Sequence, residues 1–219
     1  MRLADFVIHY LKNKNVKNFF SVTGRGTLFL NDALAREKDI KKFFFHHEQS
    51  ASFAALTTPS VNNEISCCMV STGCASTNTI TAVLSAWQDG LPVIFLSGQN
   101  FLNETTSYKK KNIRTYGQQE ADIIKIVKPI TKYSKMITNP TQIKYELDKA
   151  LFFANDKIKG PVWLDIPIDI QSSLVKNSLM ENIYKSNSLR KINDYKHPNT
   201  ITNNKLNTGN IKKDIKFII

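Results

Sequence analysis

Short apolar runs alternate with segments of helical periodicity from residue 3 to residue 166, and this order constrains the fold more than any other feature. The apolar runs predict strands at 18–23, 41–45, 65–71, 92–97 and 161–166. Apolar residues at helical spacing predict helices at 3–11, 27–38, 48–56, 76–88, 119–127 and 141–155. Because strands that alternate with helices form a parallel sheet covered on both faces, the sequence predicts an α/β fold.

The composition is that of a globular protein, with 42% hydrophobic and 22% charged residues in a chain of 219. Residues 1–171 contain all the predicted strands and helices and are expected to form one domain. After Gln171 the chain is rich in Asn, Lys and Thr and poor in large apolar residues, which is typical of a linker. We therefore expect a domain at 1–171 and an irregular C-terminal segment at 172–219.

No apolar run approaches the roughly 20 residues of a membrane-spanning helix. Asp5 and His9 interrupt the segment that would be apolar in a signal peptide, so we expect a cytoplasmic protein with no membrane partner. The three cysteines, Cys67, Cys68 and Cys74, form no C-x-x-C pair. Neither a disulfide framework nor a zinc site is therefore predicted.

A formal net charge of +12 raises the question of nucleic-acid binding. The lysines are scattered, however, and the tightest run is Lys109–Lys111. No basic stripe is interleaved with aromatic residues, as nucleic-acid grooves require. Solvated surface charge is the preferred interpretation, and no nucleic-acid partner is expected.

Glycine and polar residues follow four of the predicted strands, in the segments 23–26, 46–49, 72–76 and 98–100. Ligands of open parallel sheets bind beyond the carboxyl ends of the strands, where glycine permits close approach of the backbone. Taken singly, each glycine is better explained by an ordinary strand-to-helix turn. These segments are therefore candidates for a site, taken together rather than singly.

Glu48 follows three phenylalanines, Phe43–Phe45, that predict a buried strand. A carboxyl group among apolar side chains holds its proton more tightly than one in water, which suits an acid–base role. The alternative is a first-turn carboxylate that complements the helix dipole. Spacing alone leaves both interpretations open.

Other kinds of catalytic site are poorly supported. His46 and His47 would point to opposite faces of a strand and cannot easily share one metal ion, so no metal ligand is predicted. The chain contains no G-x-S-x-G elbow, no P-loop and no G-x-G-x-x-G after its first strand.

Four blocks together resemble a known family: "HHEQSASFAA", "MVSTGCASTNTITAVLSAWQDGLPVIFLSGQ", "YGQQEADIIKIVKPITKYSKMI" and "GPVWLDIPIDIQ". Their order and spacing are similar to those of the N-terminal pyrimidine-binding domain of thiamine diphosphate enzymes, and most similar to the acetolactate synthase group. The resemblance covers residues 1 to about 171. It implies a flavodoxin-like fold, thiamine diphosphate as cofactor, and decarboxylation or carboligation of a 2-keto acid substrate.

The resemblance also implies roles for single residues. The glutamate of the H-E-Q block, here Glu48, hydrogen-bonds a ring nitrogen of the cofactor's aminopyrimidine in that family and is the expected catalytic residue. Cofactor contacts fall on Gly24, Thr72, Gly73 and Asn78. The family's usual G-P-G-A-T-N is here Gly73-Cys74-Ala75-Ser76-Thr77-Asn78, a departure that affects fine contacts to the cofactor.

Three further residues are expected near the substrate. Gln118 and Gln119 match a glutamine-containing block of the family, whereas Arg25 replaces the family's common proline in the first loop. An arginine there suits an anionic group and suggests a substrate other than pyruvate. A solvent-facing Arg25 is the equally weighted alternative.

Family members hold magnesium and the cofactor's diphosphate through a G-D-G motif in a later domain, and no G-D-G occurs in these 219 residues. The resemblance therefore implies that 172–219 is a linker with the truncated start of a middle domain. It also implies that the site is completed between subunits, in a homodimer or with a chain that carries the diphosphate-binding domain and its magnesium. A split-gene subunit, a truncated product and a fragment all fit. The alternative function is a non-catalytic remnant or partner-binding subunit.

Overall fold

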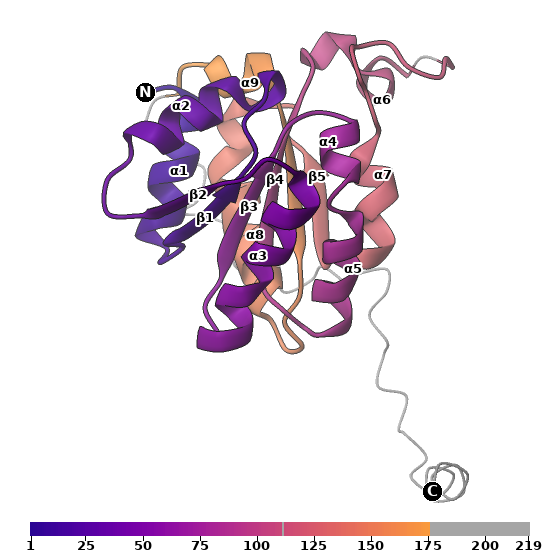
Figure 1. The fold of residues 1–219 in the computed structure, drawn as a ribbon. Coiled ribbons are helices and arrows are strands. Elements are labelled where there is room, and N and C mark those ends of the chain that lie inside the picture. Colours follow the sequence, from indigo (N-terminus) through magenta and orange to yellow (C-terminus); the bar gives the residue numbers. More distant parts are fainter. Residues whose placement is uncertain (111, 176–219) are drawn as a thin grey trace, which may run out of the picture.

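The computed structural model describes residues 1–110 and 112–175, which form a six-stranded parallel sheet with helices on both faces (Figure 1). The strands are β1 (Asn18–Ser21), β2 (Lys41–Phe44), β3 (Ser66–Val70), β4 (Val93–Gln99), β5 (Tyr133–Met136) and β6 (Val162–Pro167). Their order across the sheet is β2-β1-β3-β4-β6-β5, and every pairing is parallel. The predicted flavodoxin-like α/β fold is confirmed.

The helices form two layers. They are α1 (Leu3–Asn13), α2 (Leu28–Arg36), α3 (Glu48–Asn62), α4 (Cys74–Thr77), α5 (Ile80–Gln88), α6 (Thr106–Lys109), α7 (Ile123–Val127), α8 (Ile143–Asn155) and α9 (Ile168–Ser172). One layer contains α1, α2, α8 and α9, which pack on one another, and the other contains α3, α5 and α7. The site described below lies between the ends of these layers, where the strands finish.

Alternating residues of the central strands supply the two cores. Phe19, Cys67 and Met69 face the layer of α1, and Phe20 and Cys68 face the layer of α3. All are nearly or completely buried, because each strand is covered on both sides. This explains why the central strands are continuous apolar runs rather than alternating ones.

Strand β2 differs from the prediction of a buried strand. It lies at one edge of the sheet, where β1 is its one partner among the strands of the described residues, and Phe43 and Phe44 are 42% and 53% exposed. Phe43 stacks on Phe20 at 5.0 Å between ring centroids and covers one side of it. The apolar run reflects packing on one neighbour and an open apolar edge, not full burial.

Other element bounds also differ from the prediction. Strand β5 was not predicted, and the expected helix at 76–88 is divided into α4 and α5. Helix α3 continues to Asn62 and ends at Asn63, whose left-handed backbone (φ 59°) stops it. Helix α7 begins only at Ile123, because the Asp122 side chain accepts a hydrogen bond from the Lys125 amide and caps that end.

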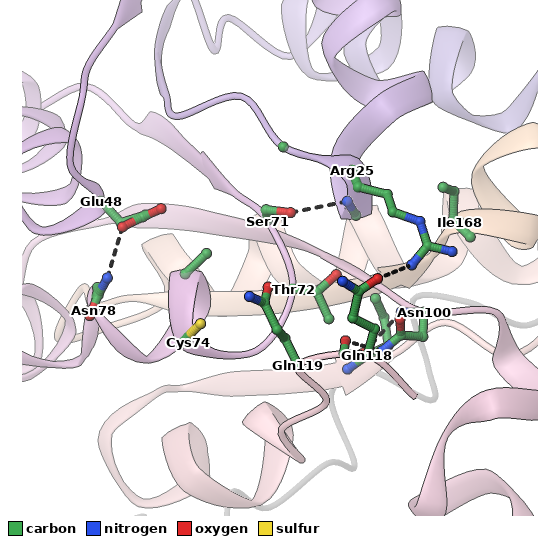
Figure 2. Close-up of a pocket in the computed structure, with 14 residues that line it drawn as sticks. Arg25, Glu48, Ser71, Thr72, Cys74, Asn78, Asn100, Gln118, Gln119 and Ile168 are labelled. Carbon is green, nitrogen blue, oxygen red and sulfur yellow. Dashed lines mark hydrogen bonds between the residues drawn. The ribbon is translucent and has the colours of Figure 1, made fainter. Parts of the chain in front are cut away.

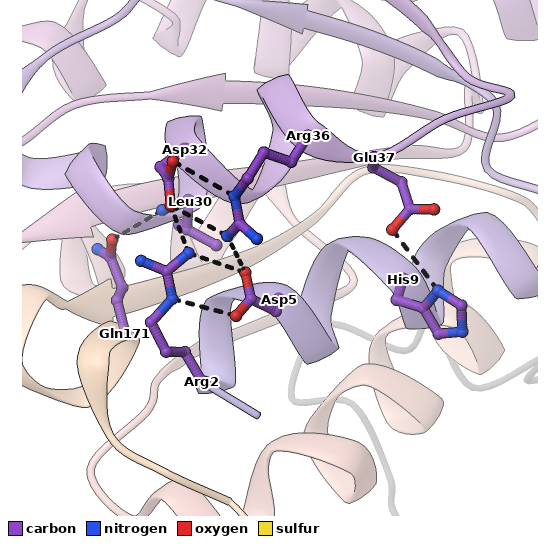
Figure 3. Close-up of polar contacts among 8 residues, drawn as sticks. All are labelled: Arg2, Asp5, His9, Leu30, Asp32, Arg36, Glu37 and Gln171. Carbon is purple, nitrogen blue, oxygen red and sulfur yellow. Dashed lines mark hydrogen bonds and ion pairs between the residues drawn. The ribbon is translucent and has the colours of Figure 1, made fainter.

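An ion network joins α1 to α2 (Figure 3). Arg2 donates two hydrogen bonds to Asp5, at 3.0 and 3.1 Å, and also pairs with Asp32. Arg36 donates to Asp32 at 3.0 Å and to Asp5. The pKa values of the Asp5 and Asp32 carboxyl groups lie below their ordinary values, mainly because both groups accept hydrogen bonds from Arg2. Every charge in this network has an opposite charge beside it.

The last described residues return to the N-terminus. The Leu3 amide donates to the Ser173 carbonyl at 2.8 Å, and the Val175 amide donates to the Met1 carbonyl at 2.9 Å. Residues 172–175 of the predicted linker are thus joined to the domain, and 176–219 lie outside the described residues. No helix in the described part is long and apolar enough to cross a membrane; the cytoplasmic location stays a prediction.

Candidate functional site

The strand order reverses between β1 and β3, since β2 lies on one side of β1 and the later strands lie on the other. Such a switch point opens a crevice at the carboxyl ends of the strands. A cavity of about 360 Å³ lies there (Figure 2). Of the residues predicted for the site, its lining includes Gly24, Arg25, Glu48, Thr72, Asn78, Gln118 and Gln119. Gly73 is not in the lining, although both of its neighbours in the chain, Thr72 and Cys74, are.

Glu48 is the first residue of α3 and projects into the cavity at one end (Figure 2). The His47 side chain caps the helix by accepting from the Gln49 amide at 3.2 Å, so Glu48 occupies the first turn. Asn78 Nδ2 donates to Glu48 Oε2 at 2.8 Å. The carboxyl group therefore complements the helix dipole and faces the cavity, and the two interpretations of the sequence are compatible.

The charge of Glu48 lies close to β3. Burial raises the pKa of the Cys68 thiol, and the Glu48 carboxylate raises it further. Cys74, in contrast, is exposed at the start of α4 and lines the cavity. The family's proline is replaced by a small polar group at this point of the lining.

Gly73 permits two loops to meet. Its φ of +62° is in the left-handed region, and a Cβ atom there would lie 1.4 Å from the Gln119 carbonyl oxygen. A side chain at this position would strain the backbone and push the Gln119 segment away. Gly73 thus holds the loop after β3 against the segment that contains Gln118 and Gln119.

The turn after β1 is held equally closely. A Cβ atom on Gly98 would lie 1.9 Å from the Gly26 carbonyl oxygen, so the turn rests directly on β4. The buried Gln171 side chain donates from Nε2 to that same oxygen at 2.6 Å and to the Ile166 carbonyl at 2.7 Å. Its Oε1 accepts from the Leu30 amide (Figure 3). These contacts fix the backbone on which Arg25 stands.

Arg25 and Gln118 meet at the end of the cavity opposite Glu48 (Figure 2). Arg25 Nη1 donates to Gln118 Oε1 at 3.1 Å. The Gln118 carbonyl accepts from Asn100 Nδ2 at 2.9 Å. The sequence placed Arg25 and Gln118 near one another only through the family resemblance, since they are far apart in the chain.

Glu120 organises the loop that carries Gln118. Its Oε1 accepts from the Thr106 amide and hydroxyl, at 2.6 and 2.7 Å, and its Oε2 accepts from the Tyr116 and Gly117 amides, at 2.8 and 3.3 Å. Burial alone would raise the pKa of this carboxyl group, but the donors outweigh burial and lower it. No sequence pattern marks Glu120, because its donors come from the start of α6 and from the loop at Tyr116 and Gly117.

A buried carboxyl group lies below the cavity. Asp165 accepts from Ser97 Oγ at 2.6 Å and from Gln99 Nε2 at 3.2 Å, and Ser97 in turn accepts from Trp163 Nε1. Burial raises the pKa of Asp165 to about 7, while the bonds from Ser97 and Gln99 act in the opposite direction. Gln99 connects this group to the cavity lining.

Several lining residues received no role from the sequence. Gln99 and Asn100 were recognised only as polar residues at a strand end, and Ile168, at the start of α9, was not noticed. Ser71 Oγ accepts from the Gly26 amide at 3.0 Å.

The described residues contain no group of three or more His, Cys, Asp or Glu side chains that could hold a metal ion.

Comparison with known proteins identifies the domain. Residues 1–126 match the family model described as the thiamine pyrophosphate enzyme, N-terminal TPP binding domain. The chain is 30% identical over 171 residues to acetolactate synthase isozyme 1 large subunit of Escherichia coli, an alignment that covers 78% of this chain and 29% of that protein. It is 31% identical over 170 residues to the acetolactate synthase large subunit of Cyanidium caldarium, covering 76% and 28%.

The acetolactate synthase large subunit of Corynebacterium glutamicum is 30% identical over 170 residues, with coverage of 78% and 26%. The matched region thus spans less than a third of the length of each of these relatives. The expected resemblance is confirmed, and with the parallel sheet and the cavity at its switch point it shows that this chain belongs to the thiamine diphosphate enzyme family, as an acetolactate-synthase-like N-terminal domain.

Proposed function

We propose that this chain supplies the pyrimidine-binding half of a thiamine diphosphate site in a 2-keto acid decarboxylase or carboligase. The observation that carries the proposal is Glu48, which projects into the cavity at the switch point and is in no ion pair within the described residues. The relatives named acetolactate synthase support carboligation as the reaction type.

The lining of the cavity fits an aminopyrimidine ring. Asn78 donates to Oε2 of Glu48, and in the described part of the chain Oε1 accepts no hydrogen bond, so that oxygen is available to a ring nitrogen. The volume of about 360 Å³ lies in the range of small-ligand sites. Gly24, Thr72 and Asn78 would line the ring, and Gly73 would hold its loop in place.

Bound thiamine diphosphate supplies the electron sink for breaking the bond between the carbonyl carbon and the carboxyl carbon of a 2-keto acid. The role proposed for Glu48 is to hold a proton at its carboxyl group and share it with the ring nitrogen. Asn78 orients the carboxyl group, because its amide fixes one of the two oxygens. The diphosphate and magnesium would be held by a domain outside this sequence.

The surface around Glu48 is suited to a partner subunit. Glu48 is only half-buried, and Phe44, Phe53 and Leu84 are 53%, 40% and 39% exposed. The last two lie on α3 and α5, which pack on one another in the same layer (Figure 1). We propose that a second copy or a chain with the diphosphate-binding domain covers this face. Exclusion of water there would strengthen the hydrogen bond of Glu48 to the cofactor.

The substitution Glu48→Gln tests this function in the complex of this chain with a chain that carries the diphosphate-binding domain. The amide keeps the size of the side chain but cannot share a proton with the ring. We expect turnover of 2-keto acids to fall by roughly a hundredfold or more, the scale of a lost acid–base group, with an unchanged unfolding midpoint.

Glu64→Gln is the matched control, because Glu64 is an exposed glutamate at the end of α3 remote from the cavity. The complex with the Glu64→Gln chain should turn over 2-keto acids as fast as the complex with the unmodified chain. Equal turnover in Glu48→Gln and Glu64→Gln would refute the catalytic role and favour the partner-binding alternative.

A further inference from the structure

The two ends of the cavity carry opposite charges. Glu48 and Asn78 lie at one end, and Arg25 and Gln118 lie at the other (Figure 2). Within residues 1–110 and 112–175, Arg25 has no carboxylate at ion-pair distance, and its hydrogen bond to Gln118 uses one N–H group of Nη1. A guanidinium has further donors in a planar fork, so those of Arg25 remain available to an anion.

The Arg25–Gln118 pair stands on two rigid supports. On one side the Gly26 carbonyl is held by Gln171, and on the other the Gln118 carbonyl is held by Asn100. Glu120 secures the loop before Gln118 through four hydrogen bonds. Because these supports exist before any ligand binds, less conformational freedom is lost on binding than for a free surface arginine.

The neighbouring lining is suited to the carbon chain of a substrate. Ile168 lies on the Arg25 side of the cavity (Figure 2) and provides an apolar surface beside the charged group. Asn100 adds a polar group at the same end. This end therefore combines a cation, amide groups and a short apolar wall.

We infer that Arg25 and Gln118 bind a distal carboxylate, so that the substrate class is a dicarboxylic 2-keto acid; this inference rests on the function proposed above. The carboxylate that leaves as carbon dioxide loses its charge in the reaction. A guanidinium on that group would stabilise the ground state more than the transition state and slow the step. A distal carboxylate keeps its charge throughout, so Arg25 can bind it without opposing decarboxylation.

The first test compares 2-oxoglutarate with 2-oxopentanoate, which has the same number of chain carbons but no distal carboxylate. It uses the complex with the diphosphate-domain chain, thiamine diphosphate and magnesium. We expect kcat/KM to favour 2-oxoglutarate by roughly tenfold or more, the scale of a charge-assisted pair. Arg25→Gln should remove this preference by raising KM for 2-oxoglutarate with little change in kcat, because the contact is equally strong in ground and transition states.

Two variants sharpen the test. Arg114→Gln is the matched control, because Arg114 is an exposed arginine outside the cavity lining, and it should leave the preference unchanged. Arg25→Lys should restore part of it, since the charge returns without the planar fork. An Arg25→Gln enzyme that keeps the preference for 2-oxoglutarate would overturn the inference while leaving the proposed function intact.

A second measurement needs no turnover. Titration of the full chain with pentanoate, followed by the amide NMR signals of Gly26 and Gln118, should give a Kd several-fold lower than titration with pentanamide, which has the same carbon chain but no carboxylate. Arg25→Gln should abolish the difference, and Arg114→Gln should not. Equal binding of pentanoate and pentanamide would overturn the inference, and so would an adventitious response that persists in both arginine variants. Failure of every keto acid to react in the complex would instead refute the proposed function.

Discussion

Charged side chains have different partners in two regions of this molecule. In the network between α1 and α2, Arg2 and Arg36 both contact Asp5 and Asp32, so each charge is compensated by the protein itself (Figure 3). In the cavity, Glu48 and Arg25 each hydrogen-bond a neutral amide and lie at opposite ends (Figure 2). The first arrangement stabilises the packing of two helices. The second leaves charge available to a ligand, and this difference separates a structural cluster from a candidate site.

The largest expected effect concerns Asp165, a buried carboxyl group whose partners in the described part of the chain are neutral as well. Its pKa of about 7 lies above the unfolded value near 4, so the folded state binds more protons between these values. The free energy of unfolding should therefore fall as pH rises from about 4 to 7, by up to about 4 kcal/mol from this group. Asp165→Asn should lack this part of the pH dependence.

Urea unfolding of the full chain at several values between pH 5 and 8 measures that dependence. Asp89→Asn, at an exposed aspartate after α5, is the control and should retain the slope of the unmodified chain. An Asp165→Asn chain with the same slope would mean that Asp165 is ionised in the folded state throughout this range.

Glu120 should give the next largest effect, because it satisfies four donors and has no cation beside it among the described residues. In Glu120→Gln the side-chain NH₂ group would face N–H donors, and we expect a loss of about 1–3 kcal/mol in the free energy of unfolding. The pKa of Glu120 is lower in the folded chain than in the unfolded chain. Its carboxylate therefore stabilises the fold at pH values above the unfolded pKa, and this stabilisation is lost as the pH falls from the unfolded pKa through the folded pKa.

Glu104→Gln is a suitable comparison, since Glu104 belongs to the same loop region and is only partly buried. Chemical denaturation at pH 7 measures both variants. A Glu120→Gln chain as stable as Glu104→Gln would show that the loop does not depend on the carboxylate. A stable Glu120→Gln chain that nevertheless loses its preference for a dicarboxylic substrate would show that Glu120 acts by positioning Gln118.

The smallest effect is expected in the network that is fully paired. Its members are accessible, with side-chain exposures of 26% for Asp5 and 55% for Arg36, so solvent screens their attraction. Asp5→Asn should lower the free energy of unfolding by at most about 1 kcal/mol, and the difference should shrink in high salt. Thermal unfolding at low and high salt measures this, and a salt-independent loss of several kcal/mol would contradict the electrostatic explanation.

Strands could be predicted from the sequence where every residue of the strand is buried. Strands β3, β4 and β6 are buried along their whole length because both faces are covered, and their mostly apolar sequences identify them directly. Strand β5 is short and combines the buried Tyr133 with the exposed Lys135 and two partly buried residues, so no periodicity marks it. The exposure of β2 could not be predicted, because edge position depends on strand order rather than on local sequence.

The site was predictable in part for a similar reason. Residues that end parallel strands share one edge of the sheet, so the segments with Gly24, Glu48 and Thr72 were grouped correctly from topology alone. Ile168 could not be identified, because it carries no polar group that suggests a ligand. The residues that hold the site's backbone in place could not be predicted either. Gln171 contacts Gly26 across 145 positions of the chain, and no local pattern encodes such a contact.

That contact of Gln171 ties the end of the domain to the candidate site. Gln171 lies four residues before Val175, and the segment between them is hydrogen-bonded to Met1 and Leu3. A pull or twist applied to the chain beyond Val175 would reach these backbone bonds first, then Gln171, and only then the turn of Arg25. The segment 172–175 thus holds Gln171 against the start of the chain. A protein shortened to residue 171 would keep every lining side chain, and Gln171 itself, while losing the backbone bonds that hold Gln171 in place.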